Sequence, residues 1–237
     1  MTDVAIRFEH VSHVYVQPGA RSFAALSELS FSIGAGEFVA ILGRSGSGKS
    51  TLLNLIAGFD RACTGHVRVG GARLDTLSES QLTAWRGRHV GVVFQFFQLL
   101  PTLTVEENLV LAMEFVGTIP QRSRRERAHE LLAAVGVDDQ ARKLPGQLSG
   151  GQQQRVAVAR ALVNQPEIII ADEPTGNLDS ASAAGVLDLF DSLRDREVTL
   201  VVVTHDELVA RRADRVLHID DGRLIPTPTE HVDGAAR

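Results

Sequence analysis

Cysteine is almost absent from the 237-residue sequence: Cys63 stands alone, which excludes an internal disulfide and a cysteine-based zinc site. So little cysteine is typical of a reducing compartment. Long apolar runs are also missing, since "TLVVV" and "EIIIA" fall far short of the roughly 20 residues that span a bilayer. The opening "MTDVAIRFEH" places charges where a signal peptide has its apolar core, so we expect no signal peptide. Any work at a membrane is therefore expected to be done from outside the lipid.

A surplus of basic charge is missing as well. The formal net charge is −5, which disfavours a protein that binds nucleic acid over its whole surface. Four basic residues do gather in one predicted helix, and a solvated helix face is favoured over nucleic-acid contact for them: Arg122, Arg124, Arg125 and Arg127. The length predicts one domain or two lobes, and no internal repeat is visible.

Four short runs predict the strands of a buried parallel sheet: residues 38–43, 89–95, 168–172 and 199–205. They are apolar throughout, as expected for strands that are covered on both faces. Helical patterns follow the first, third and fourth runs, so we expect an α/β fold with ligands at the carboxyl ends of the strands. Residues 4–16 and 65–71 instead alternate between apolar and polar, which predicts a small antiparallel sheet.

The character of the chain changes between residues 96 and 165, where helical periodicity replaces the strand runs. In "RERAHELLAAVG" the apolar residues recur at helical spacing, and Gly136 follows as an expected C-cap. We expect a single domain over residues 1–225, with a core of 1–95 and 166–225 and a helical subdomain of 96–165. Residues 226–237 are expected to form a frayed tail.

A phosphate-binding loop is the strongest motif. "GRSGSGKST" fits G-x-x-x-x-G-K-[ST] between a predicted strand and a predicted helix, so a plain glycine-rich turn is disfavoured. Its glycines let backbone N–H groups converge on phosphate oxygens, and the helix adds its positive end. We expect Lys49 to reach the β- and γ-phosphates and Ser50 to bind Mg²⁺. The predicted nucleotide-binding residues of the loop are Gly43, Ser45, Gly46, Ser47, Gly48, Lys49, Ser50 and Thr51.

An acidic pair ends the run 168–172. Alone, such a pair is more often a solvated turn, but beside a phosphate loop it predicts a hydrolytic site. We expect Asp172 to hold Mg²⁺ through water and Glu173 to polarise the attacking water.

A second helix start, "LSGGQ", carries two adjacent glycines. Ser149 and Gln152 fit a capping box, which does not account for Gly150 and Gly151. Bare glycines expose helix N–H groups and so predict a second anion site. Two phosphate-binding helix ends and one triphosphate indicate that the two ends belong to different copies of the chain.

These motifs together resemble the ATP-binding-cassette family, over about Val4 to Leu224: a phosphate loop, then "LSGGQ", then "IIIADEPTGNLDS". The resemblance implies an α/β P-loop NTPase (RecA-like) core with a parallel sheet, a small antiparallel β subdomain and an inserted helical subdomain. It also implies a head-to-tail dimer, with ATP between the phosphate loop of one copy and Ser149, Gly150, Gly151 and Gln152 of the other.

The same resemblance assigns four further positions. Gln95 would sense Mg²⁺ and the attacking water, Asp179 would cross the dimer interface, and His205 would contact the γ-phosphate. Tyr15 would stack on adenine, with Phe23 as a competitor for that role and a half-buried strand aromatic as the alternative reading. Taken alone, a glutamine or a histidine at a strand end is more often structural.

Within the family, the chain looks most like the bacterial branch that serves lipoprotein release and macrolide-type export. This implies an ATP-hydrolysing motor subunit, with ATP and Mg²⁺ as cofactors and no nucleic-acid partner. Its partners would be a transmembrane permease and a second, identical cassette. The subunit would lie in the cytoplasm, on the inner face of the cell membrane. A soluble or cell-division cassette remains the alternative, and a small-molecule kinase is disfavoured by "LSGGQ". The cargo and the direction of transport stay open.

One apolar segment is expected to contact the permease. Phe96, Phe97, Leu99 and Leu100 follow Gln95 directly, and Pro101 then breaks the segment. We expect two of the four side chains to fill the junction between the lobes and the others to form a binding surface.

Overall fold

The computed structural model describes residues 3–16, 22–194 and 197–225, so the expected tail at 226–237 lies outside the described residues. The strands are β1 (Val4–Tyr15), β2 (Phe23–Gly34), β3 (Phe38–Leu42), β4 (Thr64–Val69), β5 (Ala72–Arg73), β6 (Val90–Val93), β7 (Ile168–Asp172), β8 (Thr199–Thr204), β9 (Arg215–Asp220) and β10 (Arg223–Ile225). The helices are α1 (Lys49–Ala57), α2 (Glu79–His89), α3 (Val105–Val116), α4 (Gln121–Ala134), α5 (Gly150–Leu162), α6 (Ser180–Arg194) and α7 (Glu207–Arg212), with 3₁₀ turns at Leu74–Thr76, Asp138–Gln140 and Pro145–Gln147.

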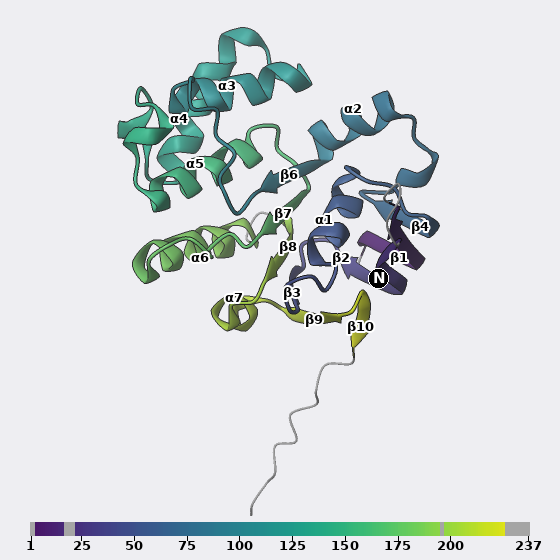
Figure 1. Cartoon of the computed structure of the whole chain (residues 1–237). Helices are drawn as coiled ribbons and strands as arrows, with labels where there is room; N and C mark the ends of the chain where they lie inside the picture. The colour runs from purple at the N-terminus through teal and green to yellow at the C-terminus, as the bar shows by residue number, and fades with distance from the viewer. Residues whose placement is uncertain (1–2, 17–21, 195–196, 226–237) are drawn as a thin grey trace, which may run out of the picture.

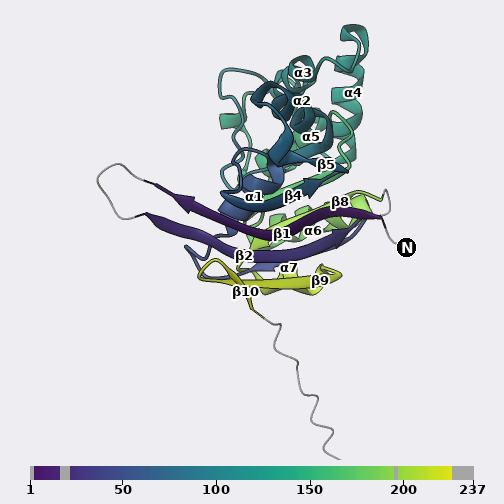
Figure 2. The same ribbon diagram turned by 90° about the vertical axis from the view of Figure 1, so that its right-hand side faces the viewer.

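The described strands form two sheets, as predicted. The larger sheet has the order β10-β9-β3-β8-β7-β6, and its strands are parallel except for β10, which runs antiparallel to β9. The smaller sheet is antiparallel, with the order β2-β1-β4-β5. Figure 1 shows α1 between the two sheets, and Figure 2 shows the long β1–β2 pair along one side of the molecule.

The parallel strands are apolar throughout because each of their faces has its own core. In β7, Ile168 and Ile170 pack with α1 and the small sheet, whereas Ile169 and Ala171 pack with α5 and α6. Successive strand residues point to opposite faces, so one strand serves both cores. Because the strand residues themselves are buried in apolar surroundings, polar side chains are found where the strands end.

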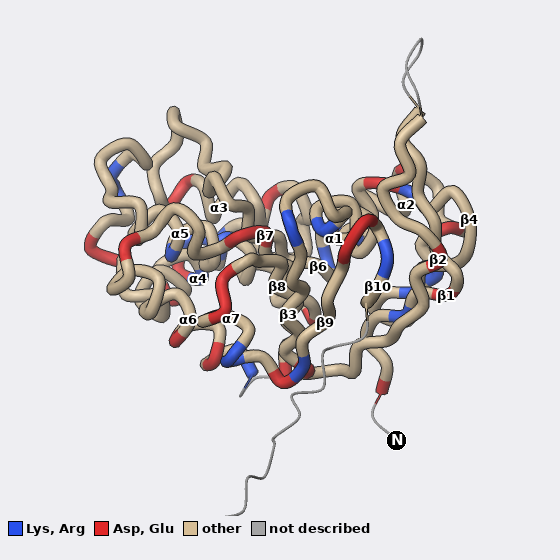
Figure 3. The backbone as a smooth tube through the Cα atoms, turned by 60° about the horizontal axis from the view of Figure 1, so that its bottom comes forward, with Lys and Arg blue, Asp and Glu red and all other residues tan. Residues whose placement is uncertain are grey.

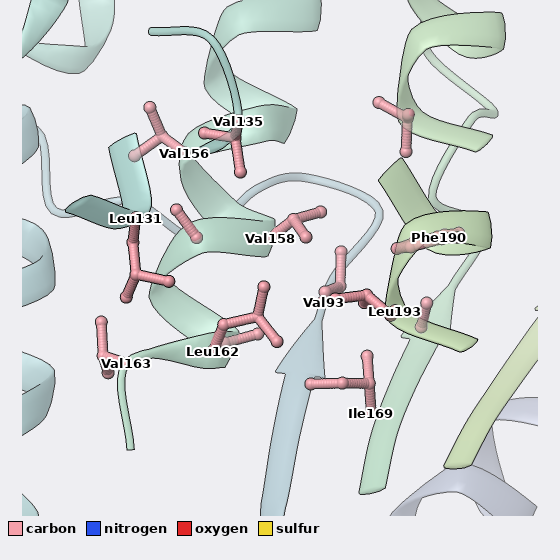
Figure 4. Packing of buried hydrophobic residues seen from close by; sticks show 14 of the residues in the cluster. Val93, Leu131, Val135, Val156, Val158, Leu162, Val163, Ile169, Phe190 and Leu193 are labelled. Atoms are coloured by element: carbon pink, nitrogen blue, oxygen red, sulfur yellow. The ribbon is translucent and has the colours of Figure 1, made fainter. Parts of the chain in front are cut away.

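Residues 96–165 contain helices, turns and loops but no strand, as an inserted helical subdomain requires; the predicted bounds of that subdomain stay a prediction. The centre of this region is α5, which packs between α4 on one side and β6, β7 and α6 on the other (Figure 4). The contacting side chains include Leu131, Val135, Val156, Val158, Leu162, Val163, Ile169, Phe190 and Leu193. The middle and the end of α5 are therefore packed against both the lobe and the sheet. Gly136 (φ +72°) follows α4 in the left-handed conformation expected of it.

The basic residues of α4 are largely paired with carboxylates. Arg124 lies 3.2 Å from Glu114, and Arg125 lies 3.1 Å from Glu106. Lys and Arg are interspersed with Asp and Glu along the chain (Figure 3), and this pairing favours the solvated-face interpretation. None of the helices that the structure describes has the length and apolarity needed to cross a bilayer.

One surface cluster predicts a pH-dependent stability. His129 Nδ1 lies 2.6 Å from Asp138 Oδ1, and its Nε2 lies 3.4 Å from Glu106, which Arg125 also contacts. The hydrogen bond to Asp138 raises the pKa of His129 above its ordinary value. The stabilisation is therefore complete below the ordinary pKa near 6.5 and is lost as the pH rises through the raised value.

We expect His129→Gln to lower the free energy of unfolding at pH 6 and to leave it unchanged at pH 9. The pair is largely exposed, so the loss should be about 0.5–1 kcal/mol. Urea titrations at the two pH values measure it, and Asp138→Asn should reproduce the loss. An equal effect of His129→Gln at both pH values would contradict the assignment.

Candidate active site

A cavity of about 660 Å³ opens where β3 and β7 end. It is lined by Phe23, Gly43, Arg44, Ser45, Gly46, Gly48, Lys49, Ser50, Thr51, Gln95, Asp172, Glu173 and His205. The ends of four strands of the large sheet, β3, β6, β7 and β8, therefore contribute to one cavity, and most of the predicted phosphate-loop residues line it.

The glycines of the loop are required by close approaches. Gly48 has φ +101°, and a Cβ there would lie 2.4 Å from the carbonyl oxygen of Ala25. A Cβ at Gly43 would lie 2.3 Å from the carbonyl oxygen of Ile219. The loop thus lies tightly between the two sheets, with no room for a side chain at Gly43 or Gly48.

Lys49 is a buried cation at the floor of this loop. Its Nζ donates to the carbonyl oxygens of Gly43 and Arg44, both at 2.8 Å. These two hydrogen bonds join the end of the loop, at Lys49, to its beginning, at Gly43 and Arg44. Because carbonyl oxygens neutralise no charge, the ammonium remains available to an anion.

Ser50 and Asp172 form the oxygen-rich side of the cavity. Ser50 Oγ donates to Asp172 Oδ2 at 3.1 Å across the gap between α1 and β7. Burial raises the pKa of Asp172, and the nearby Glu173 raises it further, while Ser50 and Lys49 oppose the shift. A buried carboxyl group with a raised pKa is one whose charged form a bound cation would stabilise.

Glu173 is held in place by the end of β8. Its Oε1 accepts from His205 Nδ1 at 2.8 Å, and its Oε2 accepts from Thr204 Oγ1 at 3.1 Å. The backbone of Glu173 has φ +45°, a conformation that turns the carboxylate out of the strand and into the cavity wall. Thr204 did not emerge from the sequence; its place directly before His205, at the end of the apolar run 199–205, is the signal that could have found it.

Gln95 lies on the opposite wall, just after β6. Its carbonyl oxygen accepts from Asn177 Nδ2 at 3.2 Å, which ties the segment after β6 to the segment after β7. The next residues, Phe97 and Gln98, both have positive φ. Arg160 of α5 donates to their carbonyl oxygens, at 2.8 Å for Phe97, and this arginine was not singled out from the sequence.

The two candidate aromatics are cross-strand neighbours. Tyr15 pairs with Phe23 between β1 and β2. Phe23 lines the cavity, whereas the hydroxyl of Tyr15 donates to Thr51 Oγ1 at 3.4 Å beside it. Both aromatics are therefore within reach of one base, and the choice between them stays a prediction.

The glycine helix lies elsewhere. Ser149 forms the predicted capping box with Gln152: Ser149 Oγ accepts from the N–H of Gln152 at 3.3 Å, and Ser149 N donates to Gln152 Oε1 at 3.0 Å. None of the residues Ser149, Gly150, Gly151, Gln152 and Asp179 lines the cavity at the phosphate loop. Within one chain the two helix ends are not brought together.

Gly151 has a reason within its own chain that the sequence did not reveal. A Cβ there would lie 2.5 Å from Ser182 Oγ and 2.7 Å from Ser182 Cβ, so this glycine makes room for α6. A Cβ at Gly150 would meet nothing closer than 3.6 Å. We expected both glycines to leave room for an incoming phosphate. Free space is found only at Gly150, because the space at Gly151 is already filled by Ser182.

Asp179 begins α6 in a similar way. Its Oδ1 accepts from the N–H groups of Ala181 and Ser182, and its Oδ2 accepts from Ser182 Oγ at 2.7 Å. These hydrogen bonds lower the pKa of Asp179. The same hydrogen bonds hold Ser182 next to Gly151, so the first turns of α5 and α6 are in direct contact.

The site consists of strand β3, a glycine-rich loop and helix α1, which begins at Lys49. Asp172 lies at the end of β7, two strands away from β3 in the sheet. This arrangement defines a P-loop nucleoside triphosphatase. The model of the ABC transporter family matches residues 26–176. The chain belongs to this family, and it is the ATP-binding, ATP-hydrolysing motor subunit of a transporter.

The relatives and solved structures agree with this assignment. An uncharacterised ABC transporter ATP-binding protein of Mycobacterium tuberculosis is 48% identical over 202 residues, which cover 85% of this chain and 81% of that protein. The macrolide export ATP-binding/permease protein MacB of Shigella flexneri is 46% identical over 210 residues, which cover 89% of this chain but 32% of MacB. This chain thus spans about a third of MacB. The cassette MJ0796, solved as a dimer in a post-hydrolysis state bound to ADP and Pi, superposes with a TM-score of 0.87 at 41% identity and covers 93% of this chain and 97% of MJ0796.

Proposed function

We propose that the cassette closes as a head-to-tail homodimer on Mg-ATP and thereby drives a transmembrane permease, in export or in the extraction of envelope cargo. The supporting observation is the separation, in one chain, of the phosphate loop from the glycine helix. A second copy would supply the missing helix end to each triphosphate. The structural relative MJ0796 is a dimer. The site of action would be the cytoplasmic face of the cell membrane.

The residues of the cavity fit a magnesium ion. Hydroxyl, carboxylate and amide oxygens are the ligands that Mg²⁺ prefers, and Ser50, Asp172 and Gln95 supply one of each to the lining of the cavity. Ser50 and Gln95 would bind the ion directly and Asp172 through water. The ion would neutralise charge on the phosphates.

The protein's own groups would perform the proton transfer. Glu173 is the proposed general base, since its carboxylate lines the cavity and is oriented by Thr204 and His205. Its carboxylate would take the proton of the attacking water, while His205 would reach the γ-phosphate. Lys49 would stabilise the charge on the β- and γ-phosphates.

The proposed docking surface for the permease is a groove between the two lobes. A cavity of about 580 Å³ is lined by the ends of α2, α3 and α5 together with β6 and Gln98. It adjoins a second cavity of about 460 Å³, with which it shares Gly87, Phe115 and Val116. Phe115 is 82% exposed and Phe59 is 50% exposed, which is unusual for such large apolar side chains.

The polar groups of the groove favour an acidic segment as the occupant. Arg86 donates to the carbonyl oxygen of Gly58 and lies 4.6 Å above the ring of Phe59, and Arg160 donates only to carbonyl oxygens. Burial lowers the pKa of both arginines, and neither forms a salt bridge with a residue that the structure describes. Beside them, Asn164 Oδ1 is buried without a hydrogen-bond partner. A permease segment with a carboxylate and apolar neighbours would match these groups.

The expected apolar segment contributes at the edge of this surface. Phe96 and Leu100 are exposed, whereas Leu99 packs into the lobe core and Phe97 is half-buried beside Gly150. This division agrees with the expectation that two of the four side chains fill the junction. Whether the exposed pair contacts a permease stays a prediction.

We expect Phe115→Ser to lower co-purification of the cassette with its permease from detergent-solubilised membranes by at least tenfold, as for an interface anchor. Basal ATPase of the isolated cassette should persist, because Phe115 is exposed and does not line the ATP cavity. Arg122→Ser, on the exposed face of α4, is the matched control. Wild-type recovery of the permease with Phe115→Ser would exclude this groove.

A further inference from the structure

The buried histidine of β1 has no place in the chemistry described above. His13 is 5% exposed, and it lies two residues before Tyr15 on the same face of the strand. Their rings are in contact, with centroids 4.6 Å apart and planes inclined at 75°. This edge-to-face arrangement is the favourable one for two aromatic rings.

His13 is itself fixed by the loop that follows the phosphate-loop helix. Its Nδ1 donates to the carbonyl oxygen of Arg61 at 2.9 Å, and its Nε2 lies 3.3 Å from Asp60 Oδ2, a close contact that does not have the geometry of a hydrogen bond. The backbone of the same loop joins β1 through the N–H of Cys63, which donates to Ser12 at 2.9 Å. The imidazole ring therefore cannot turn without breaking contacts at both nitrogens.

These contacts connect the two ends of α1 to the candidate base-binding aromatic. Thr51, in the first turn of α1, accepts from the hydroxyl of Tyr15, and Asp60 follows the last turn of α1. At 3.4 Å the hydroxyl bond alone is long. The ring of His13 supplies the second contact that determines where the ring of Tyr15 lies.

We propose that His13 is a positioning residue for the nucleobase: anchored by Asp60 and Arg61, it holds Tyr15 against α1 and so sets affinity for the base without acting on the phosphates. The inference rests on the proposed function of Tyr15 as the stacking aromatic. The inference predicts that removing the His13 ring weakens binding only of ligands that contain a nucleobase.

The test compares ADP with inorganic pyrophosphate in calorimetric titrations of the full chain, since neither ligand is hydrolysed and only ADP carries a base. His13→Ala should weaken ADP binding about 3- to 10-fold, the range expected for one aromatic contact, and leave pyrophosphate binding unchanged. In ATPase assays KM should rise by a similar factor while kcat at saturating ATP stays at the wild-type value. Cys63→Ser, which alters the same cluster without removing the ring, is the control and should change neither ligand.

Two further variants separate the possible failures. Tyr15→Ala should weaken ADP binding at least as much as His13→Ala; an unchanged affinity would overturn both the stacking role and the inference that rests on it. If Tyr15→Ala weakens ADP binding and His13→Ala does not, the positioning role alone is overturned. Equal losses for ADP and pyrophosphate in His13→Ala would show a general structural effect and would also overturn it. His13→Phe, which keeps a ring but loses both anchors, should bind ADP more tightly than His13→Ala.

Discussion

Glu173→Gln is expected to slow ATP hydrolysis by roughly 10²–10⁴, the usual contribution of a general base, while ATP binding stays close to wild type. The substitution preserves the shape of a side chain that is held by Thr204 and His205 but removes its ability to take a proton. Because the closed dimer would then persist, light scattering should detect an ATP-dependent dimer in the variant. Steady-state phosphate release measures the loss of rate.

Lys49→Ala is the contrasting variant. It removes the buried ammonium that we propose contacts the β- and γ-phosphates, so nucleotide binding itself should be lost, and no dimer should form. Wild-type turnover in Glu173→Gln would refute the assignment of the base. Loss of ATP binding in Glu173→Gln would show instead that the carboxylate is needed to hold the loop.

The second large effect concerns Gly151. Gly151→Ala places a Cβ 2.5 Å from Ser182 Oγ and 2.7 Å from its Cβ, where α5 and α6 begin. Since the side chain of Ser182 is also held by Asp179, the helices must separate, and we expect ATPase activity to fall by at least tenfold. Ser182→Gly in the same chain removes the atoms that clash.

The double variant Gly151→Ala/Ser182→Gly should therefore recover most of the activity lost in Gly151→Ala. Ser182→Gly alone measures what the loss of the hydroxyl costs. No recovery would mean that Gly151 is needed for something other than room for Ser182, such as a partner's phosphate. Thermal melts of the four proteins separate loss of fold from loss of chemistry.

Much of the fold could be predicted because the informative patterns are local. The runs at 38–43, 168–172 and 199–205 became β3, β7 and β8, since uninterrupted apolar β-branched residues suit a strand that is covered on both faces. The phosphate loop, the acidic pair and the capping box were identifiable because each depends on residue types at fixed spacing. The order of these motifs along the sequence also indicated the ATP-binding-cassette family.

What could not be predicted depends on contacts between distant segments. Gly151 packs against Ser182, which lies 31 positions later in the sequence. Arg160 donates to the carbonyl oxygen of Phe97, which lies 63 positions earlier. Strand β9, "RVLHID", was missed because its residues are only partly buried at the sheet's side next to β10 and so lack a continuous apolar run. His13 gave no signal, since a histidine in an alternating strand has no distinctive spacing.

The central claim is that one ATP lies between the phosphate loop of one chain and the glycine helix of another. Gly150→Asp offers a clean way to disable the helix, because a side chain fits there and a carboxylate in the first turn suits the helix dipole. The same carboxylate would repel a triphosphate. Gly150→Asp and Lys49→Ala should each be inactive alone, one lacking the helix site and the other the phosphate loop.

Mixing these two inactive variants in equal amounts and measuring ATPase activity is the most direct test. A pair of like variants has no intact composite site, whereas a mixed pair has one of two, so activity should appear only on mixing and reach at most about half of the wild-type value. Recovery of that activity on mixing is the predicted result, and a mixture as inactive as its two components would contradict the shared site.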